Sequence, residues 1–376
     1  MDKNFWYAVS TLIGMVVGVG IFALPYVFYE AGFFVGLIYL IVLFGVFLIL
    51  HLMMGEVVLR TTQKHRFIGY IGLYLGEVSK NIVAFTNIFV VLGTLLAYIL
   101  IAGPFLDVVS NSLFSSIELN QVIFWAVMSF ILFFGIEILK RSELFFLVFL
   151  VFFIIGVFVY GINYIELSSF ETTNLENFFL PYGVIMYSFA GISAIPLMRD
   201  ILTGEEKKLK KSISVGVSII ALFSFLLVFA VVGISGDGIT EDALTGLSSV
   251  MGYGVIFWGA LFGLFAIATS YIAYAFYIKN TLVYDFKLRE NIAFAIVVLV
   301  PIVLLFLIPT GFIGLLMFLG AMLGGIEAIF LIALYKKAIK TGNRRPEYSL
   351  KIPKSVFWLM IIIFVLGIFY EIFYNL

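Results

Sequence analysis

The stretch Gly18-Val19-Gly20-Ile21-Phe22-Ala23-Leu24-Pro25 decides the fold, because it places two glycines and a proline inside a long apolar run near the N-terminus. A second stretch, Gly191-Ile192-Ser193-Ala194-Ile195-Pro196, matches residues 20–25 at glycine, isoleucine, alanine and proline. Proline removes a helical hydrogen bond, and glycine weakens a helix and permits unusual dihedral angles. A simple proline kink would explain either hexapeptide alone. Two hexapeptides in corresponding spans predict two interrupted membrane helices instead.

The composition around these stretches is that of a polytopic membrane protein. Of 376 residues, 63% are apolar and 12% are charged, whereas soluble domains carry roughly 25% charged residues. The 22 basic and 22 acidic side chains cancel, so nucleic acid is not an expected partner. The absence of cysteine excludes disulfides, iron–sulfur clusters and thiol catalysis.

Apolar runs of about 20 residues, each long enough to cross a bilayer, predict an all-α protein with eleven transmembrane helices. The expected spans are residues 5–29, 33–59, 81–106, 121–139, 143–164, 177–199, 213–235, 252–280, 291–308, 311–335 and 355–374. Every Lys and Arg lies between spans on one side of this arrangement, and the opposite loops carry only acidic charges. The positive-inside rule then predicts a multi-pass cell-membrane protein, surrounded by lipid, with a cytoplasmic N-terminus and an extracytoplasmic C-terminus.

The segment 61–79, between the second and third spans, is too polar to cross the membrane. Its apolar residues recur at helical spacing, which predicts a short amphipathic helix along the inner membrane surface. An ordinary solvated loop is the alternative.

The two hexapeptides also predict an internal repeat. They fall in the first spans of two sets of five, and because five is odd the two sets have opposite orientations, as in an inverted-topology repeat. We expect a first repeat at residues 1–164, a second, inverted repeat at 165–345, and an additional helix at 346–376.

The interrupted helices predict a binding site. The outer half of the first span would begin near Ile21, so its free N–H groups and positive dipole end suit a carboxylate. The outer half of the sixth span would end near Ala190, so its carbonyls and negative dipole end suit an ammonium group. Together the two ends would bind a zwitterionic amino acid through backbone groups.

Residues 18–25, together with Tyr187-Ser188-Phe189-Ala190-Gly191 and Pro196, resemble the amino acid/auxin permease and bacterial aromatic amino acid permease groups. These groups belong to the amino acid–polyamine–organocation superfamily. The resemblance implies a LeuT-type fold, with two inverted five-helix repeats, broken helices 1 and 6 and an added eleventh helix. It also implies transport of neutral amino acids, including aromatic or large ones.

The resemblance assigns two sets of substrate-binding residues. The substrate carboxylate would meet Gly18, Val19, Gly20 and Ile21. The amino group and side chain would meet Tyr187, Phe189, Ala190, Gly191 and Ser193. Phe189 resembles the aromatic residue that gates this fold from outside, although an ordinary packing role is equally open.

A coupling-ion site is implied by Ala266-Ile267-Ala268-Thr269-Ser270, which is similar to the sodium-binding run of sodium-coupled relatives. In that resemblance, the carbonyl of Ala266 and the hydroxyls of Thr269 and Ser270 bind Na⁺, completed by the carbonyls of Gly14 and Val17. The alternative is that both hydroxyls bond back to their own helix. The predicted fifth span, 143–164, has no lysine past its cytoplasmic edge, which favours Na⁺, but proton-coupled relatives carry similar runs.

Proton coupling would require an ionisable group inside the membrane. Glu327 lies in the middle of the tenth span, where a carboxylate is costly and is a functional candidate. Glu56 is a second candidate, but it precedes Arg60 by one helical turn, so an intrahelical ion pair is the simpler explanation.

The leading interpretation is a secondary amino acid transporter that uses alternating access and is coupled to a Na⁺ or H⁺ gradient. An uncoupled exchanger and a channel-like facilitator of another small solute are the alternatives. The chain lacks a nucleotide-binding Gly-x-x-x-x-Gly-Lys-Ser/Thr motif and clustered catalytic side chains. We therefore expect no enzyme activity, no cofactor and no obligate protein partner.

Overall fold

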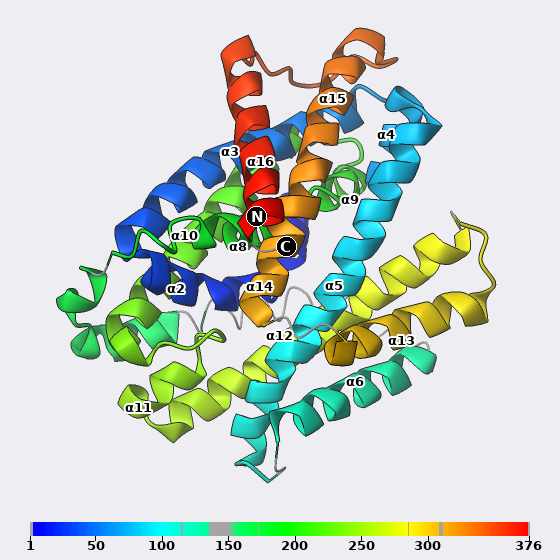
Figure 1. Ribbon diagram of the computed structural model, residues 1–376. Coiled ribbons are helices and arrows are strands. Elements are labelled where there is room, and N and C mark those ends of the chain that lie inside the picture. The colour runs from blue at the N-terminus through cyan, green and yellow to red at the C-terminus, as the bar shows by residue number, and fades with distance from the viewer. Residues whose placement is uncertain are drawn as a thin grey trace.

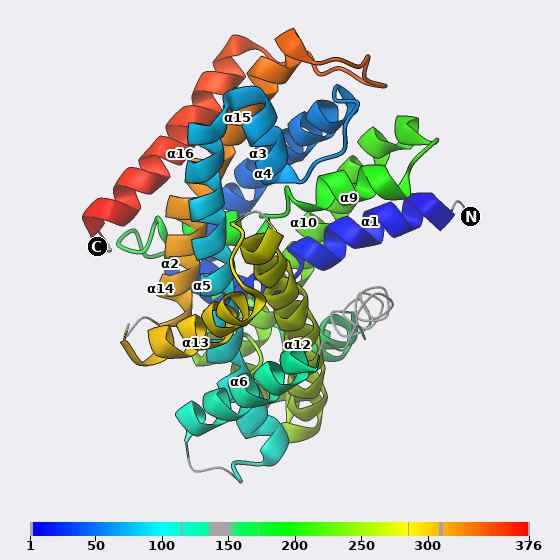
Figure 2. The ribbon, with the colours of Figure 1, turned by 90° about the vertical axis from the view of Figure 1, so that its right-hand side faces the viewer.

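The computed structural model of the protein describes residues 3–113, 116–134, 152, 155–171, 173–284, 286–307 and 311–374. All secondary structure in these ranges is helical. Figures 1 and 2 show long helices packed side by side, with α16 on the outside of the bundle against α15.

The first half of the chain contains a short apolar helix at Ile155–Tyr164 and, among the described residues, six further helices. They are α1 (Lys3–Val16), α2 (Gly20–Ala31), α3 (Phe33–Leu59), α4 (Phe67–Leu75), α5 (Glu77–Ser110) and α6 (Ile117–Phe133). The second half contains α8 (Leu180–Ser188), α9 (Ala194–Ile201), α10 (Leu209–Ser235), α11 (Ser248–Met251), α12 (Tyr253–Tyr284), α13 (Glu290–Leu307), α14 (Phe312–Met317), α15 (Gly325–Thr341) and α16 (Lys354–Tyr374). A π-helical segment, η7 (Phe318–Gly324), joins α14 to α15. Short 3₁₀ turns lie at Ile162–Tyr164, Leu167–Phe170, Glu206–Lys208, Gly236–Gly238 and Thr245–Leu247.

The membrane spans agree with the sequence prediction wherever the structure describes them. By length and composition, seven described helices can cross a membrane, and the bent pair α1–α2 raises the number to eight. Helices or helix pairs are also found at the predicted spans 121–139 and 177–199. Half of the predicted span 143–164 lies outside the described residues, as do Lys140 and Arg141, so the number eleven stays a prediction.

The first interrupted span is confirmed, but its break is not within residues 20–25. Helix α1 ends at Val16 and α2 begins at Gly20, with a bend of 58° between them. The prediction that the hexapeptide itself interrupts the helix was therefore wrong, because Pro25 lies inside α2. A membrane helix tolerates an internal proline, and the unwound residues 17–19 instead meet a side chain from α5, described below.

The second interrupted span has its break at residues 189–193, between α8 and α9. Here the hexapeptide begins inside the break, as predicted. Pro196 lies in the first turn of α9, where the backbone nitrogen has no helical partner to lose. Both half-helix ends agree with the prediction, since α2 begins next to Ile21 and α8 ends shortly before Ala190.

Helix α4 confirms the short helix expected within residues 61–79. It is separated from α5 by Gly76, whose φ of 85° lies in the region that side chains rarely adopt and glycine adopts freely. Phe67, Ile68 and Ile71 are buried against the bundle, so this helix is packed onto α5 and α15. Its position relative to the membrane surface stays a prediction.

Segments predicted on the basic side of the membrane meet at one end of the bundle, here called the basic end. Lys64 Nζ lies 2.8 Å from Asp200 Oδ1, and Asn4 Nδ2 donates to Glu205 Oε2 at 3.3 Å. The loops at residues 60–66, 199–211 and 342–350 therefore lie together.

The loops without basic residues meet at the opposite end, here called the acidic end. The Tyr29 hydroxyl donates to Asp237, and Asn177 Nδ2 donates to the Glu30 carboxylate at 3.2 Å. Helix α16 reaches this end, because Tyr370 stacks on Phe179. The described chain thus begins at the basic end and finishes at the acidic end, as an odd number of spans requires.

Candidate functional site

The two helix breaks lie against each other. A Cβ atom added to Gly20 would be 2.5 Å from Ser188 Oγ and 2.9 Å from Tyr187 Cδ1. A Cβ atom added to Gly191 would overlap the Val16 side chain. Each glycine therefore allows one break to approach the other more closely than any side chain would permit.

This contact brings two helix ends of opposite polarity to one place. Helix α2 begins at Gly20 without a side-chain cap, and its first N–H groups make only long bonds, such as Ile21 N to Gly18 O at 3.4 Å. Helix α8 ends at Ser188. The amino end of a helix attracts anions and the carboxyl end attracts cations, so the site can hold both charges of a zwitterion.

Three tyrosines from three helices surround the breaks. The Tyr98 hydroxyl of α5 lies beside the first break, 2.9 Å from the position of a Cβ on Gly18 and near Val19 and Ser270. The Tyr187 hydroxyl of α8 donates to Thr94 Oγ1 at 3.1 Å. The Tyr274 hydroxyl of α12 donates to the Met15 carbonyl at 3.3 Å. These contacts hold α5 and α12 against the unwound segment.

Sequence reasoning missed Tyr98, Thr94 and Tyr274. A usable signal was present, since Thr94 and Tyr98 are one helical turn apart in a membrane span, and so are Ser270 and Tyr274. The sequence holds 20 tyrosines, however, and only their packing singles out these.

His51 of α3 also reaches the second break. Its Nδ1 lies 2.7 Å from the Phe47 carbonyl, and because a carbonyl only accepts, Nδ1 carries the proton. Nε2 of a neutral imidazole with that tautomer is an acceptor. This atom is buried without a partner, and it lies 3.5 Å from the position of a Cβ on Gly191. A hydrogen-bond acceptor without a protein partner therefore lies beside the second break.

The remaining predicted substrate residues lie in or beside the breaks. Gly18 faces the Tyr98 hydroxyl, and Phe189 is buried with its ring 5.9 Å from that of Phe47. Ala190 is exposed, whereas Ser193 precedes α9 without capping it. The structure brings the predicted residues together, and their contacts with a substrate stay a proposal.

Of the predicted sodium ligands, Ala266, Thr269 and Ser270 lie on α12, whereas Gly14 lies in α1 and Val17 directly follows it. Tyr274, one turn after Ser270, bonds α12 to α1. Thr269 Oγ1 donates to the Ala266 carbonyl at 2.9 Å, which is the back-bonding weighed as the alternative. Ser270 lies near the Tyr98 hydroxyl. A bound ion would therefore have to replace the bond that Thr269 makes to its own helix.

Glu327, the first proton candidate, belongs to a three-helix chain of hydrogen bonds. Asn87 Nδ2 of α5 donates to Glu327 Oε1 at 3.1 Å, and Tyr277 of α12 donates to Asn87 Oδ1 at 2.9 Å. Glu327 directly follows η7, whose Gly320 packs onto the α8 backbone at Gly183 and Tyr187. Glu327 is thus connected to the second break through the packing of η7 on α8.

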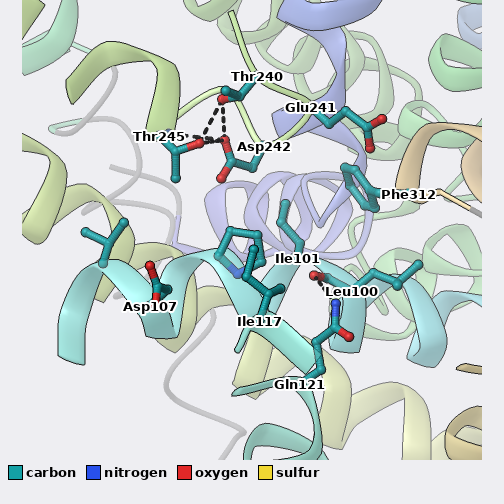
Figure 3. Close-up of a pocket in the computed structure, with 12 residues that line it drawn as sticks. Leu100, Ile101, Asp107, Ile117, Gln121, Thr240, Glu241, Asp242, Thr245 and Phe312 are labelled. Atoms are coloured by element: carbon teal, nitrogen blue, oxygen red, sulfur yellow. Dashed lines mark hydrogen bonds between the residues drawn. The ribbon is translucent and has the colours of Figure 1, made fainter. Parts of the chain in front are cut away.

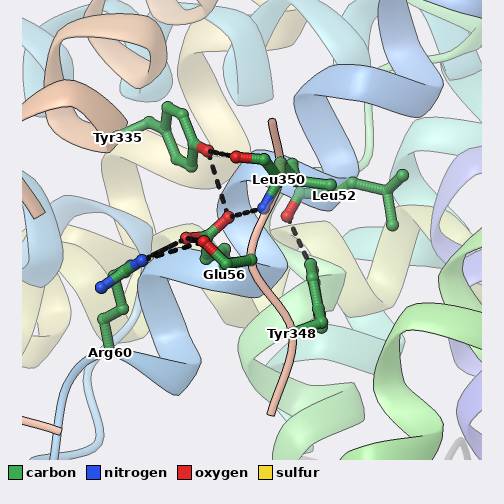
Figure 4. Close-up of polar contacts among 7 residues, drawn as sticks. Leu52, Glu56, Arg60, Tyr335, Tyr348 and Leu350 are labelled. Atoms are coloured by element: carbon green, nitrogen blue, oxygen red, sulfur yellow. Dashed lines mark hydrogen bonds and ion pairs between the residues drawn. The ribbon is translucent and has the colours of Figure 1, made fainter. Parts of the chain in front are cut away.

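Glu56, the second proton candidate, is part of a buried network at the basic end (Figure 4). Arg60 Nη2 lies 2.7 Å from its carboxylate, which confirms the expected ion pair. The carboxylate also accepts from the Tyr335 hydroxyl at 3.1 Å and from Leu350 N at 2.7 Å. Burial, aided by the Glu56 charge, raises the pKa of the Tyr348 phenol well above its usual value. These contacts fasten the 342–350 segment to α3.

Comparison with known proteins gives matches of two kinds. A family model described as the tryptophan/tyrosine permease family matches residues 1–373. No curated protein sequence matches the chain.

Two of the similar solved structures are of the same transporter. Mhp1, a nucleobase-cation-symport-1 family transporter, in a closed conformation with bromovinylhydantoin bound, has a TM-score of 0.68 at 12% identity, over 97% of this chain and 89% of that one. Its inward-facing conformation has a TM-score of 0.60 at 15% identity, over 87% and 76% of the two chains. This likeness confirms the predicted LeuT-type fold.

Proposed function

The chain belongs to the tryptophan/tyrosine permease family, and from this premise we propose that it is a cation-coupled transporter of neutral amino acids, with aromatic ones as the first candidates. It is a membrane transporter rather than an enzyme, and its fold is that of secondary transporters that use alternating access. The proposal concerns the substrate, its contacts and the coupling ion.

The observation that carries the proposal is the close approach of the two breaks at Gly20 and Gly191. It places the amino end of α2 and the carboxyl end of α8 where they would bind the carboxylate and the ammonium group of one amino acid. His51 Nε2 adds an acceptor for the ammonium group, on the side where α8 ends. Backbone and a neutral imidazole thus recognise the part that all amino acids share.

The surroundings of the breaks favour a neutral side chain. Among the described residues, the buried charged ones are Glu56, Arg199, Asp242 and Glu371, and none of these belongs to a break. Tyr187 and Phe189 provide an aromatic wall instead. An apolar or aromatic substrate side chain would therefore bind there without leaving a charged residue of the protein unpaired.

For coupling, we propose Na⁺, held by the carbonyls of Gly14, Val17 and Ala266 and the hydroxyls of Thr269 and Ser270. Support comes from α12, which carries these hydroxyls and also bonds to α1 through Tyr274. An ion there would link α12 to the first break.

A proton carried by Glu327 is the second candidate. The observation that favours it is the bond from Asn87, a neutral partner, which suits a carboxyl group that gains and loses a proton inside a membrane. For Glu56 the ion pair with Arg60 favours a structural role.

The proposed topology has residues 1–164 and 165–345 as inverted repeats and 346–376 as an added helix. Its N-terminus would be cytoplasmic and its C-terminus extracytoplasmic. An uncoupled exchanger with the same site is the alternative.

Uptake of labelled tryptophan, tyrosine and leucine into proteoliposomes, with sodium and proton gradients imposed separately, tests the proposal. We expect saturable uptake that follows one of the two gradients. Exchange of internal for external amino acid without response to either gradient would instead establish the exchanger. Absence of any amino acid uptake or exchange would contradict the proposal.

A further inference from the structure

A second hollow lies at the acidic end, away from the helix breaks. It has a volume of about 430 Å³, within the range of small-molecule sites. Its wall is made by the last turns of α5, the first turns of α6, the 240–245 loop and the start of α14 (Figure 3).

Asp242 is the polar group in this wall that lacks part of its hydrogen bonding. Its side chain is 5% exposed, and its Oδ1 accepts from Thr240 Oγ1 at 2.6 Å and from Thr245 Oγ1 at 2.8 Å. It also accepts from the backbone of Leu244 and Thr245. Oδ2, by contrast, is buried without a partner. Figure 3 shows Oδ1 at the dashed bonds and the other oxygen pointing into the cavity.

The hydrogen-bond donors of the other polar side chains in the wall are used largely within the protein. The Gln121 amide nitrogen donates to the Leu100 carbonyl at 3.2 Å, which Pro104 leaves without its helical partner. The Thr240 and Thr245 hydroxyls donate to Asp242 Oδ1 within the loop. The cavity thus presents mainly hydrogen-bond acceptors, which suit a ligand that carries a hydrogen-bond donor.

The charge around the cavity has one sign. Asp107 and Glu241 lie on its wall with Asp242, and the segments that build it, within residues 81–139, 212–278 and 290–335, contain no Lys or Arg. A carboxylate in the ligand would be repelled here without a partner. The amino acid proposed for the helix breaks is therefore a poor fit for this cavity.

A metal ion also fits poorly. Among the residues that the structure describes, no three His, Cys, Asp or Glu side chains are grouped closely enough to hold a metal. The remaining wall is apolar, from residues Leu100, Ile101, Pro104, Val108, Ile117 and Phe312. A ligand that fills it needs both a cationic donor and an apolar body.

We propose that this cavity is a binding site for primary amines that carry an apolar or aromatic group and no carboxylate. The ammonium group donates to Asp242 Oδ2, and the apolar group packs against α5 and Phe312. The site is independent of the amino acid site, so the chain binds two classes of ligand at two places.

Isothermal titration of the purified full chain with tryptamine tests the proposal. Asp242→Asn keeps an oxygen for the bonds to the 240–245 loop but replaces the free oxygen with a donor, so the affinity for tryptamine should fall by about tenfold or more. Glu118→Gln removes one exposed charge from the same end without lining the cavity, and should leave the affinity within about twofold. N-acetyltryptamine, which has no charge, should not bind.

Competition with tryptophan provides the second part of this test. Saturating tryptophan should leave tryptamine binding unchanged, and Asp242→Asn should leave tryptophan binding unchanged, which also shows that the variant is folded. Displacement of tryptamine by tryptophan, or a wild-type tryptamine affinity in Asp242→Asn, would overturn the proposal. Because tryptamine binding to the wild-type chain is measured without an amino acid, a failure of amino acid binding would leave that result standing, and thermal unfolding would then show that Asp242→Asn is folded.

Discussion

Replacing Gly20 with alanine tests the contact between the breaks with a single methyl group. The nearest atoms cannot move aside, because Ser188 Oγ is bonded to the Val184 carbonyl at 2.7 Å and the Tyr187 ring is held by Thr94. The Ser188 Cα atom would also be 3.1 Å away. The added Cβ atom would lie 2.5 Å from Ser188 Oγ. To restore an ordinary van der Waals distance, the breaks must separate by about 0.9 Å.

Overpacking of this size costs about 1–3 kcal/mol. Since the separated breaks no longer present both helix ends to one ligand, that cost should appear as a roughly tenfold to hundredfold weaker affinity for the amino acid. The assay is equilibrium binding of labelled tryptophan to the purified protein, with thermal unfolding measured in parallel.

Two variants control this experiment. Gly45→Ala makes the same change in α3 where no atom lies within 4 Å, so binding should stay at the wild-type level. Ser188→Ala removes the nearest atom, and combined with Gly20→Ala it should restore part of the affinity. Unchanged binding in Gly20→Ala, or an equal loss in Gly45→Ala, would refute the close-approach argument.

Four further predictions concern recognition, coupling and topology. His51→Phe removes the acceptor beside Gly191 and should weaken tryptophan binding about tenfold, while an unaffected affinity would return His51 to a packing role. Thr269→Val keeps the shape and deletes one proposed ligand, so it should raise the sodium concentration needed for half-maximal uptake; uptake indifferent to sodium in the wild type would exclude that site. Glu327→Gln should abolish proton-driven accumulation and preserve exchange if Glu327 carries the proton, whereas equal loss of both indicates a structural role through Asn87. A reporter fused after Leu376 should be extracytoplasmic, and a cytoplasmic signal would show that the spans were miscounted.

Much of the fold could be predicted from the sequence because membrane spans need only length and apolarity. The glycines of the two hexapeptides predicted that two spans are broken. They did not locate the first break, since Pro25 is accommodated within α2 while the Tyr98 hydroxyl meets Val19. That contact depends on how α5 packs, which no local pattern encodes.

The site was predictable to the extent that its interactions are local. Glu56 and Arg60 are one turn apart, so their pairing followed from helical geometry. Asp242 is one of several acidic loop residues in the sequence, and its free oxygen is apparent only when the 240–245 loop is folded. The position of His51 beside the second break could not be predicted either, since Gly191 is distant in sequence.

The central claim is that the two helix ends recognise both charges of one amino acid. Displacement of bound labelled tryptophan by tryptophan, tryptophan methyl ester and N-acetyltryptophan tests it most directly. The methyl ester lacks the carboxylate and the acetyl compound lacks the ammonium group, so we expect tryptophan to displace the label and each analogue to need roughly hundredfold higher concentration. Displacement by either analogue as effective as that by tryptophan would contradict the account.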